Sequence, residues 1–111
     1  MKIMLRTFQA ALVLIASLGT SWAYGDVVWV DVRTYLEHKV DHIEGDIRIS
    51  YQDVVEELPA LVPDKNTEIK LYCRSGGRAE RAKNALIQAG YQDVENVGSI
   101  DDARKLRDLA E

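Results

Sequence analysis

The chain contains one cysteine, Cys73, and its neighbours give that thiol a setting suited to nucleophilic chemistry. It opens the segment Cys73-Arg74-Ser75-Gly76-Gly77-Arg78, in which two arginines flank a serine and a pair of glycines. A thiol reacts as its thiolate, and its ordinary pKa of about 8.5 falls beside cations and helix N-termini. The two glycines can also turn successive backbone N–H groups inward as a nest for an anion. The pattern therefore predicts an activated nucleophile in a loop that binds a small anion.

A strand before Cys73 and a helix after the glycines must position this loop, and the sequence predicts both. The segment Glu68–Tyr72 indicates a strand that delivers Cys73 at its carboxyl end. A helix is expected from residue 78 or 79 to residue 88 or 89, because small apolar residues recur there at helical spacing before a stop at Gly90. Such a helix points the partial positive charge of its N-terminus at the loop.

Alternating strands and helices along the rest of the chain predict a parallel sheet. Val27–Val30 is an apolar run without polar alternation, as in a strand that is covered on both faces. A helix capped by Thr34 and Glu37 is expected to end near Lys39, before a short apolar stretch around Ile47 and Ile49. A second helix is expected over Tyr51–Leu58, capped by Ser50 and closed by Pro59 and Pro63. A strand over Val94–Val97 and a helix over Asp102–Leu109 complete the pattern. This alternation implies right-handed crossovers, and ligands then lie at the carboxyl ends of the strands, where Cys73 is placed.

Residues 1–23 have the composition of a secretory signal peptide. Two basic residues and no acid accompany a largely apolar run, Phe8–Leu18. Ser21-Trp22-Ala23 then offers small residues at the spacing of a cleavage site. The apolar run is about half the length of the roughly 20 residues that span a membrane. We therefore expect export to the periplasm and one mature domain, residues 24–111, with no membrane partner after cleavage.

The charge and the cysteine content of this mature domain limit its partners. Its net charge is −6, because the segment removed holds two of the 14 basic residues and none of the 18 acidic ones. Such a charge disfavours nucleic acid as a partner. From Cys73 to Lys83, four cations and one acid reverse this balance locally, so a small anion is the expected ligand. A single cysteine excludes a disulfide within the domain, and no cofactor is expected.

Three motifs occur in the order of one known family. The segment Cys73–Ala79 resembles the active-site loop of rhodanese sulfurtransferases, whose cysteine accepts a sulfane sulfur. Val30–Arg33 is similar to the D-V-R strand end of that family, and His42–Ile47 is similar to its H-I-x-G-A segment. Residues 62–66 and 90–97 are similar to the corresponding stretches of small periplasmic members. The resemblance extends over nearly all of residues 24–111, which it identifies as one rhodanese domain.

This resemblance implies an α/β fold with a central parallel five-stranded sheet flanked by helices, and a two-step reaction. Cys73 would take the outer sulfur of thiosulfate, release sulfite, and pass the sulfur from its persulfide to a thiophilic acceptor such as cyanide or a thiol. By the same resemblance the loop amides and Arg78 surround the persulfide, and Arg74 lies at the pocket mouth. Asp31 and Arg33 match positions that brace the loops. The expected substrate-binding residues are thus Arg74, Ser75, Gly76, Gly77 and Arg78.

The chain departs from the family pattern in three places. Asp46 stands where alanine is usual, and Ser50 stands where proline is usual. Near the C-terminus, Gly98-Ser99-Ile100 replaces a pair of glycines followed by a tryptophan. This last change bears on the pocket wall and on substrate preference, and it leaves the cysteine loop untouched.

Other functions use similar residues. Phosphatases and arsenate reductases on the same fold place five residues between their cysteine and arginine, whereas four residues separate Cys73 from Arg78, which favours a single sulfur atom over a tetrahedral oxyanion. A persulfide carrier or binding module that is not an enzyme needs the same loaded cysteine, so the sequence leaves it open. A metal site at His38 and His42 is disfavoured, because the helix is expected to end before His42 and the ligand set is small.

Overall fold

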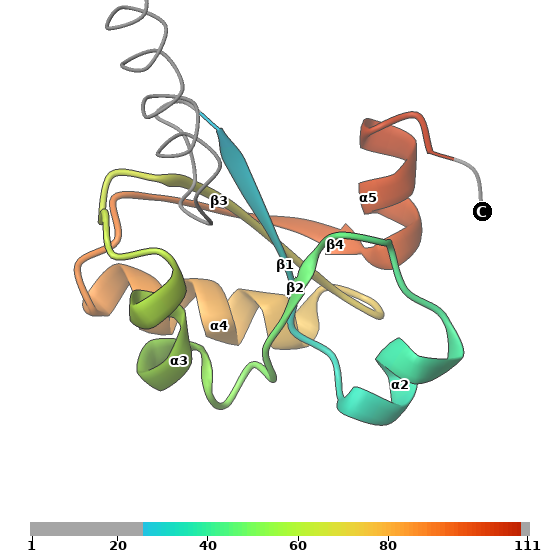
Figure 1. The fold of residues 1–111 in the computed structure, drawn as a ribbon, viewed down its shortest axis with the longest axis horizontal. Coiled ribbons are helices and arrows are strands. Elements are labelled where there is room, and N and C mark those ends of the chain that lie inside the picture. The colour runs from blue at the N-terminus through green and yellow to red at the C-terminus, as the bar shows by residue number, and fades with distance from the viewer. Residues whose placement is uncertain (1–25, 110–111) are drawn as a thin grey trace, which may run out of the picture.

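A sheet of four parallel strands forms the centre of the molecule in a computed structural model that describes residues 26–109 (Figure 1). The predicted signal peptide, residues 1–23, lies outside the described residues. The strand order is β2-β1-β3-β4, so the chain crosses from β2 over β1 to reach β3. The strands are β1 (Val27–Asp31), β2 (Ile47–Arg48), β3 (Glu68–Cys73) and β4 (Asp93–Ser99).

Four helices connect and cover these strands: α2 (Tyr35–Val40), α3 (Val54–Leu61), α4 (Gly77–Gln88) and α5 (Ile100–Leu106). The helices α3 and α4 pack on one face of the sheet and α5 on the other (Figure 1). The prediction of a parallel α/β fold is confirmed. The expectation of five strands is not met within residues 26–109, because the segments between the four strands fold into helices joined by short turns.

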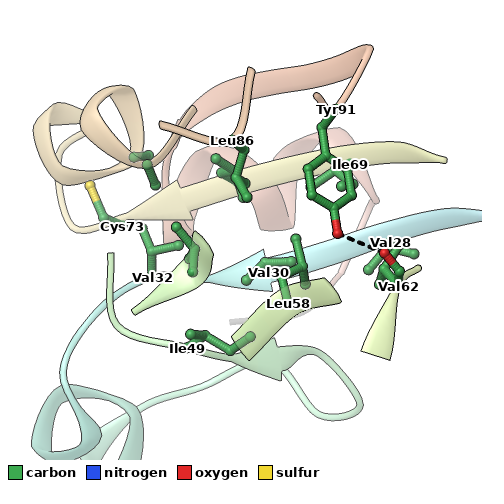
Figure 2. Packing of buried hydrophobic residues seen from close by; sticks show 14 residues of the cluster. Val28, Val30, Val32, Ile49, Leu58, Val62, Ile69, Cys73, Leu86 and Tyr91 are labelled. Atoms are coloured by element: carbon green, nitrogen blue, oxygen red, sulfur yellow. Dashed lines mark hydrogen bonds between the residues drawn. The ribbon is translucent and has the colours of Figure 1, made fainter. Parts of the chain in front are cut away.

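The core lies mainly between the sheet and the pair α3 and α4. Figure 2 shows this cluster, in which Val28 and Val30 of β1 meet Ile69 of β3, Leu58 of α3 and Leu86 of α4. All five of these side chains are fully buried. Removing apolar surface from water is the main favourable term in folding, so this layer fixes the helices against the sheet.

The opposite face carries a smaller cluster under α5. Tyr72 of β3 points to this side and packs with Ile43, Ile100 and Ala103. Because side chains alternate along a strand, Cys73 points to the other side, toward α4. The alternation therefore separates the Cys73 side chain from the α5 side of the molecule.

Two helices differ from their predicted bounds. The helix expected over Tyr51–Leu58 begins at Val54, because the backbone N–H of Tyr51 still bonds the carbonyl of Val32, 3.1 Å away, alongside the sheet. It also continues past Pro59, which lies inside α3 and does not end it. The helix expected over Asp102–Leu109 spans Ile100–Leu106.

The start of α5 has a local cause in the sequence. The side chain of Ser99 accepts a hydrogen bond from the N–H of Asp102, and the Asp102 carboxylate accepts one from the N–H of Ser99. This reciprocal capping box fixes Ser99 as the N-cap. The capping box predicted at Thr34 and Glu37 is confirmed at the start of α2.

Candidate active site

Cys73 is the last residue of β3, and its sulfur lies at the turn that leads into α4 (Figure 2). The residue is 1% exposed. The backbone N–H of Gly76 donates to the Cys73 sulfur at 2.9 Å. Gly76 is the N-cap of α4 and has a φ of +102°, in the left-handed region that glycine enters without strain. The predicted glycine turn is therefore present and directs an amide at the sulfur.

The pKa of Cys73 lies below its ordinary value. Burial by itself raises the pKa of this thiol, because it disfavours the charged form. Hydrogen bonding to the backbone N–H groups of residues 79, 75, 76 and 78 together lowers the pKa by more than burial raises it. The thiolate is thus stabilised chiefly by the backbone of the loop and by the first turn of α4.

Asn96 of β4 supports this loop from the side. Its side-chain amide donates to the carbonyl of Gly76 at 2.9 Å, and its side-chain oxygen accepts from the N–H of Gly98, also at 2.9 Å. A bulge shifts the register between β3 and β4 at this point, so that Tyr72 pairs with Gly98. Asn96 was not among the predicted site residues. The sequence signal that could have indicated it is an amide side chain within the predicted strand Val94–Val97, two residues before Gly98.

Arg78 does not stand free at the helix start. Its guanidinium donates to both carboxylate oxygens of Glu37 in α2, with Nη1–Oε1 at 2.7 Å and Nη2–Oε2 at 2.9 Å. This bidentate pair raises the pKa of Arg78 and lowers the pKa of Glu37 to about 2. The charge of the Cys73 thiolate also raises the pKa of Arg78, so the guanidinium lies within electrostatic reach of the sulfur.

One of the remaining predicted site residues, Arg74, borders an open cleft of about 550 Å³. Arg74 lines this cleft and is exposed. Its other walls come from Leu36, Glu37 and Val40 of α2 and from Ile100 at the start of α5. Ser75 and Gly77 are exposed in the loop, and Gly76 is half-buried. The structure thus brings Arg74 and Glu37, the partner of Arg78, to the walls of one cleft.

Asp31 and Arg33 form a buried brace under α2. The Arg33 guanidinium donates to the Asp31 carboxylate at 2.8 Å and to the backbone carbonyl of Asp41 at 2.6 Å. Since Asp41 is the C-cap of α2, the brace ties the end of that helix to the end of β1. The two residues hold the cleft wall, as their resemblance to bracing positions implied.

Asp46, which stands where the family usually has alanine, accepts hydrogen bonds from two side chains. The Tyr72 hydroxyl donates to the Asp46 carboxylate at 2.6 Å, and Arg107 donates to both of its oxygens at 2.7 and 3.0 Å. The Arg107 guanidinium also lies over the ring of Trp29, 4.2 Å from its centroid. Burial and the neighbouring Asp46 carboxylate raise the pKa of Tyr72, which keeps its hydroxyl a donor.

The two histidines stack on each other at the end of α2. Their ring centroids are 4.3 Å apart, and His42 contacts the backbone carbonyl of His38 and the carboxylate of Glu44. The helix ends at Val40, before His42, as expected. Within residues 26–109, no cluster of three or more histidine, cysteine or acidic side chains is arranged to hold a metal ion. No helix of that part of the chain is long and apolar enough to cross a membrane.

Comparison with known proteins agrees with this geometry. Residues 20–103 match the family described as Rhodanese-like domain. The chain is 34% identical over 95 residues to thiosulfate sulfurtransferase PspE of Escherichia coli strain K12, covering 86% of this chain and 91% of that protein. It is also 34% identical over 89 residues to tRNA uridine(34) hydroxylase of Yersinia pestis, of which it spans 25%.

Solved structures show the same likeness. A rhodanese with anions from E. coli matches with a TM-score of 0.66 and 38% identity, over 69% of this chain and 91% of the other. The rhodanese-like domain of the Alr3790 protein from Anabaena sp. matches with a TM-score of 0.66 and 25% identity, over 87% of this chain and 89% of the other.

Proposed function

The chain belongs to the rhodanese-like domain family, as its motifs predicted, and we propose that it is a thiosulfate sulfurtransferase working through a persulfide on Cys73. One observation carries the proposal. The only thiol of the chain lies at the N-terminus of α4, and backbone N–H groups of the turn stabilise its thiolate. The similarity to a thiosulfate sulfurtransferase over most of both chains supports the choice of reaction.

The reaction balances in two steps. The Cys73 thiolate attacks the outer sulfur of thiosulfate, the S–S bond breaks, and its electron pair leaves with sulfite. An acceptor such as cyanide or a thiolate then attacks the outer sulfur of the persulfide, and the bond between the two sulfurs breaks to regenerate the Cys73 thiolate. Both steps place negative charge on sulfur inside the turn, where the amide of Gly76 donates. Preorganised amides of this kind stabilise such charge without reorganisation.

Each proposed binding residue has a defined place in this scheme. The amides of Ser75 and Gly76 hydrogen-bond the sulfur, and Gly77 is the first residue of the helix that follows. Arg78 adds a positive charge within reach of the sulfur. Arg74, which has no ion-pair partner among the described residues, meets the anionic end of the donor at the cleft. These roles follow from position and charge.

Two alternatives use the same cysteine. The four-residue interval between Cys73 and Arg78 favours sulfur over a phosphate or arsenate group, because a shorter loop encloses a smaller ligand. A persulfide carrier would load Cys73 in the same way but would hand its sulfur only to a protein partner. Repeated turnover with cyanide or a small thiol distinguishes the enzyme from the carrier.

We also propose that the protein is exported. The basic start, the short apolar run and the small residues before position 24 support this location. In the periplasm the acceptor would be cyanide or a thiol that reaches the cleft beside α2.

Mass spectrometry of the protein after exposure to thiosulfate tests the function directly. We expect a gain of one sulfur atom on Cys73, its loss on addition of cyanide with formation of thiocyanate, and neither event in Cys73→Ser. Sulfur transfer that survives in Cys73→Ser would rule out the mechanism. Persulfide formation without repeated thiocyanate production would favour the carrier. The same spectrum of exported protein should show an N-terminus at Tyr24.

A further inference from the structure

The Glu37 carboxylate makes two sets of hydrogen bonds, one that caps α2 and one with Arg78. Its Oε1 accepts from the backbone N–H of Thr34 at 3.1 Å and from the Thr34 hydroxyl at 3.0 Å, which completes the capping box of α2. The same carboxylate accepts hydrogen bonds from both terminal nitrogens of Arg78. A residue that the local sequence explains as a helix cap therefore also holds the loop arginine, which comes 41 positions later.

The charges around the cleft are largely paired within the protein. Arg33 is neutralised by Asp31, and Arg78 is neutralised by Glu37. Of the two arginines that line the cleft, Arg74 alone has no ion-pair partner among the described residues. An anionic donor that approaches Cys73 thus meets two cations: Arg74, which is unpaired within residues 26–109, and Arg78, whose charge the Glu37 carboxylate already offsets.

We propose that Glu37 is a specificity-determining residue, which weakens the binding of an anionic sulfur donor by neutralising Arg78 from α2. The donor's identity rests on the proposed sulfurtransferase function, whereas the effect of Glu37 on the charge at Cys73 does not. Glu37 contacts Arg78 and not the sulfur, so it acts through the arginine. Its carboxylate also lines the cleft and repels an incoming anion directly.

The charged groups that face Arg78 define how the pair can be tested. They are Glu37 of α2, Asp31 of β1 and the Cys73 thiolate of β3. Asp31 is held by Arg33, so Glu37 is the acid whose removal changes the field of Arg78 most. Glutamine can replace glutamate in a capping box, because its side-chain oxygen still accepts from the N-cap N–H. Glu37→Gln therefore removes the charge and keeps the helix start.

Steady-state kinetics and thiol alkylation of Glu37→Gln form the test. We expect the KM for thiosulfate to fall about fivefold with a smaller change in kcat, as for loss of a partly exposed ion-pair partner. The rate of Cys73 alkylation by iodoacetamide at pH 6 should rise about threefold, because the unmasked guanidinium favours the thiolate. The alkylation rate needs no turnover, so it tests Glu37 even if the protein proves not to use thiosulfate.

Two control variants separate charge at Arg78 from other effects. Glu56→Gln removes one negative charge from the exposed side of α3 and should leave both readouts unchanged. Thr34→Ala weakens the capping box without removing the Glu37 charge, and it should lower the midpoint of thermal unfolding without lowering KM.

Several outcomes would overturn the proposal. Unchanged KM and alkylation rate in Glu37→Gln would show that the carboxylate does not mask Arg78. A raised KM would show that Glu37 holds Arg78 in its productive orientation. An equal fall in KM for Glu56→Gln would assign the effect to net charge, and an equal fall for Thr34→Ala would assign it to the structure of α2.

Discussion

At the scale of single residues, the lowered pKa of Cys73 comes mainly from backbone hydrogen bonds. Four backbone N–H groups of the loop and of the first turn of α4 outweigh the burial that would otherwise raise the pKa of the thiol. Arg78 contributes a charge that Glu37 partly offsets, and Arg74 contributes an unpaired one at the cleft. Removal of Arg78 is therefore expected to leave the Glu37 carboxylate unpaired, whereas removal of Arg74 leaves no carboxylate of the described residues unpaired.

Replacement of Arg78 should impair thiosulfate use more than replacement of Arg74. Arg78→Ala removes a cation and also leaves the Glu37 carboxylate unpaired at the cleft, where it repels the donor. We expect kcat/KM for thiosulfate to fall about tenfold in Arg78→Ala and about threefold in Arg74→Ala. The double variant Glu37→Gln with Arg78→Ala should recover part of the loss. The reverse ranking of the single variants would contradict these roles, with circular dichroism confirming that each variant is folded.

At the scale of elements, the site is a meeting of three segments around the end of β3. The start of α4 supplies the amides, β4 supports the turn through Asn96, and α2 holds Arg78 through Glu37. The bulge in β4 matters here because it brings Gly98 beside Gly76, so closely that a Cβ added to Gly76 would lie 3.5 Å from the Gly98 Cα. The family's usual pair of glycines is reduced to this single residue.

Gly98 should therefore tolerate no side chain. Its φ is +105°, and a Cβ there would come within 2.5 Å of the Asp102 carboxylate that caps α5. Gly98→Ala should lower the free energy of unfolding by about 2 kcal/mol, through backbone strain and the disturbed cap. Urea denaturation measures this loss.

Gly77→Ala is the matched control in the same loop. Nothing lies within 4 Å of a Cβ at Gly77, and its φ is not positive. Alanine also loses less backbone entropy on folding than glycine, so this variant should gain about 0.4–1 kcal/mol. Equal effects of the two substitutions would contradict the conformational explanation.

The link between α2 and α4 should make stability depend on pH in the acid range. The pKa of Glu37 falls from an ordinary 4.5 to about 2 in the folded protein, so its contribution is fully present above pH 4.5 and is lost as the pH falls through 2. With a discount for partial exposure, wild type should lose about 1–2 kcal/mol more than Glu37→Gln between pH 5 and pH 2. Other carboxylates are common to both proteins, so their effects cancel. Parallel curves of unfolding free energy against pH would show that the pair adds no stability.

At the scale of the whole molecule, the domain has no disulfide of its own, and ion pairs fix α5 to the far face of the sheet. Arg104 pairs with Asp41 at the end of α2, and Arg107 pairs with Asp46 before β2. Both pairs join segments that are more than 60 positions apart along the chain. They attach the C-terminal helix on the side of the sheet opposite the Cys73 side chain.

Restoring the family's usual alanine at position 46 should destabilise this protein. Asp46→Ala leaves the buried Tyr72 hydroxyl and the Arg107 guanidinium without their acceptor, which should cost about 2–3 kcal/mol of unfolding free energy. Asp46→Asn keeps an acceptor oxygen and should cost less. Because Cys73 faces the other side of the sheet, kcat/KM of the folded variants should stay within about twofold of wild type. Urea denaturation together with kinetics checks both expectations, and a stable Asp46→Ala would refute the structural role of this pair.

The sequence by itself determined what depends on neighbours a few positions apart. The strand before Cys73, the helix after it, the glycine turn between them and the capping box at Thr34 all follow from local spacing, and the structure confirms them. Strand–helix alternation also determined the parallel sheet, because such crossovers have one favoured hand. The position of Cys73, at the end of a strand and just before a helix, was therefore predictable from the chain alone.

Only the tertiary structure decided which distant side chains meet. The pairing of Glu37 with Arg78, the support of the turn by Asn96 and the partners of Asp46 join residues 20 to 61 positions apart, and no local pattern specifies them. The structure also shows that α3 continues through Pro59. The physical reason is that local patterns specify the type and order of the elements, whereas the charge left at the site depends on which elements the sheet brings into contact.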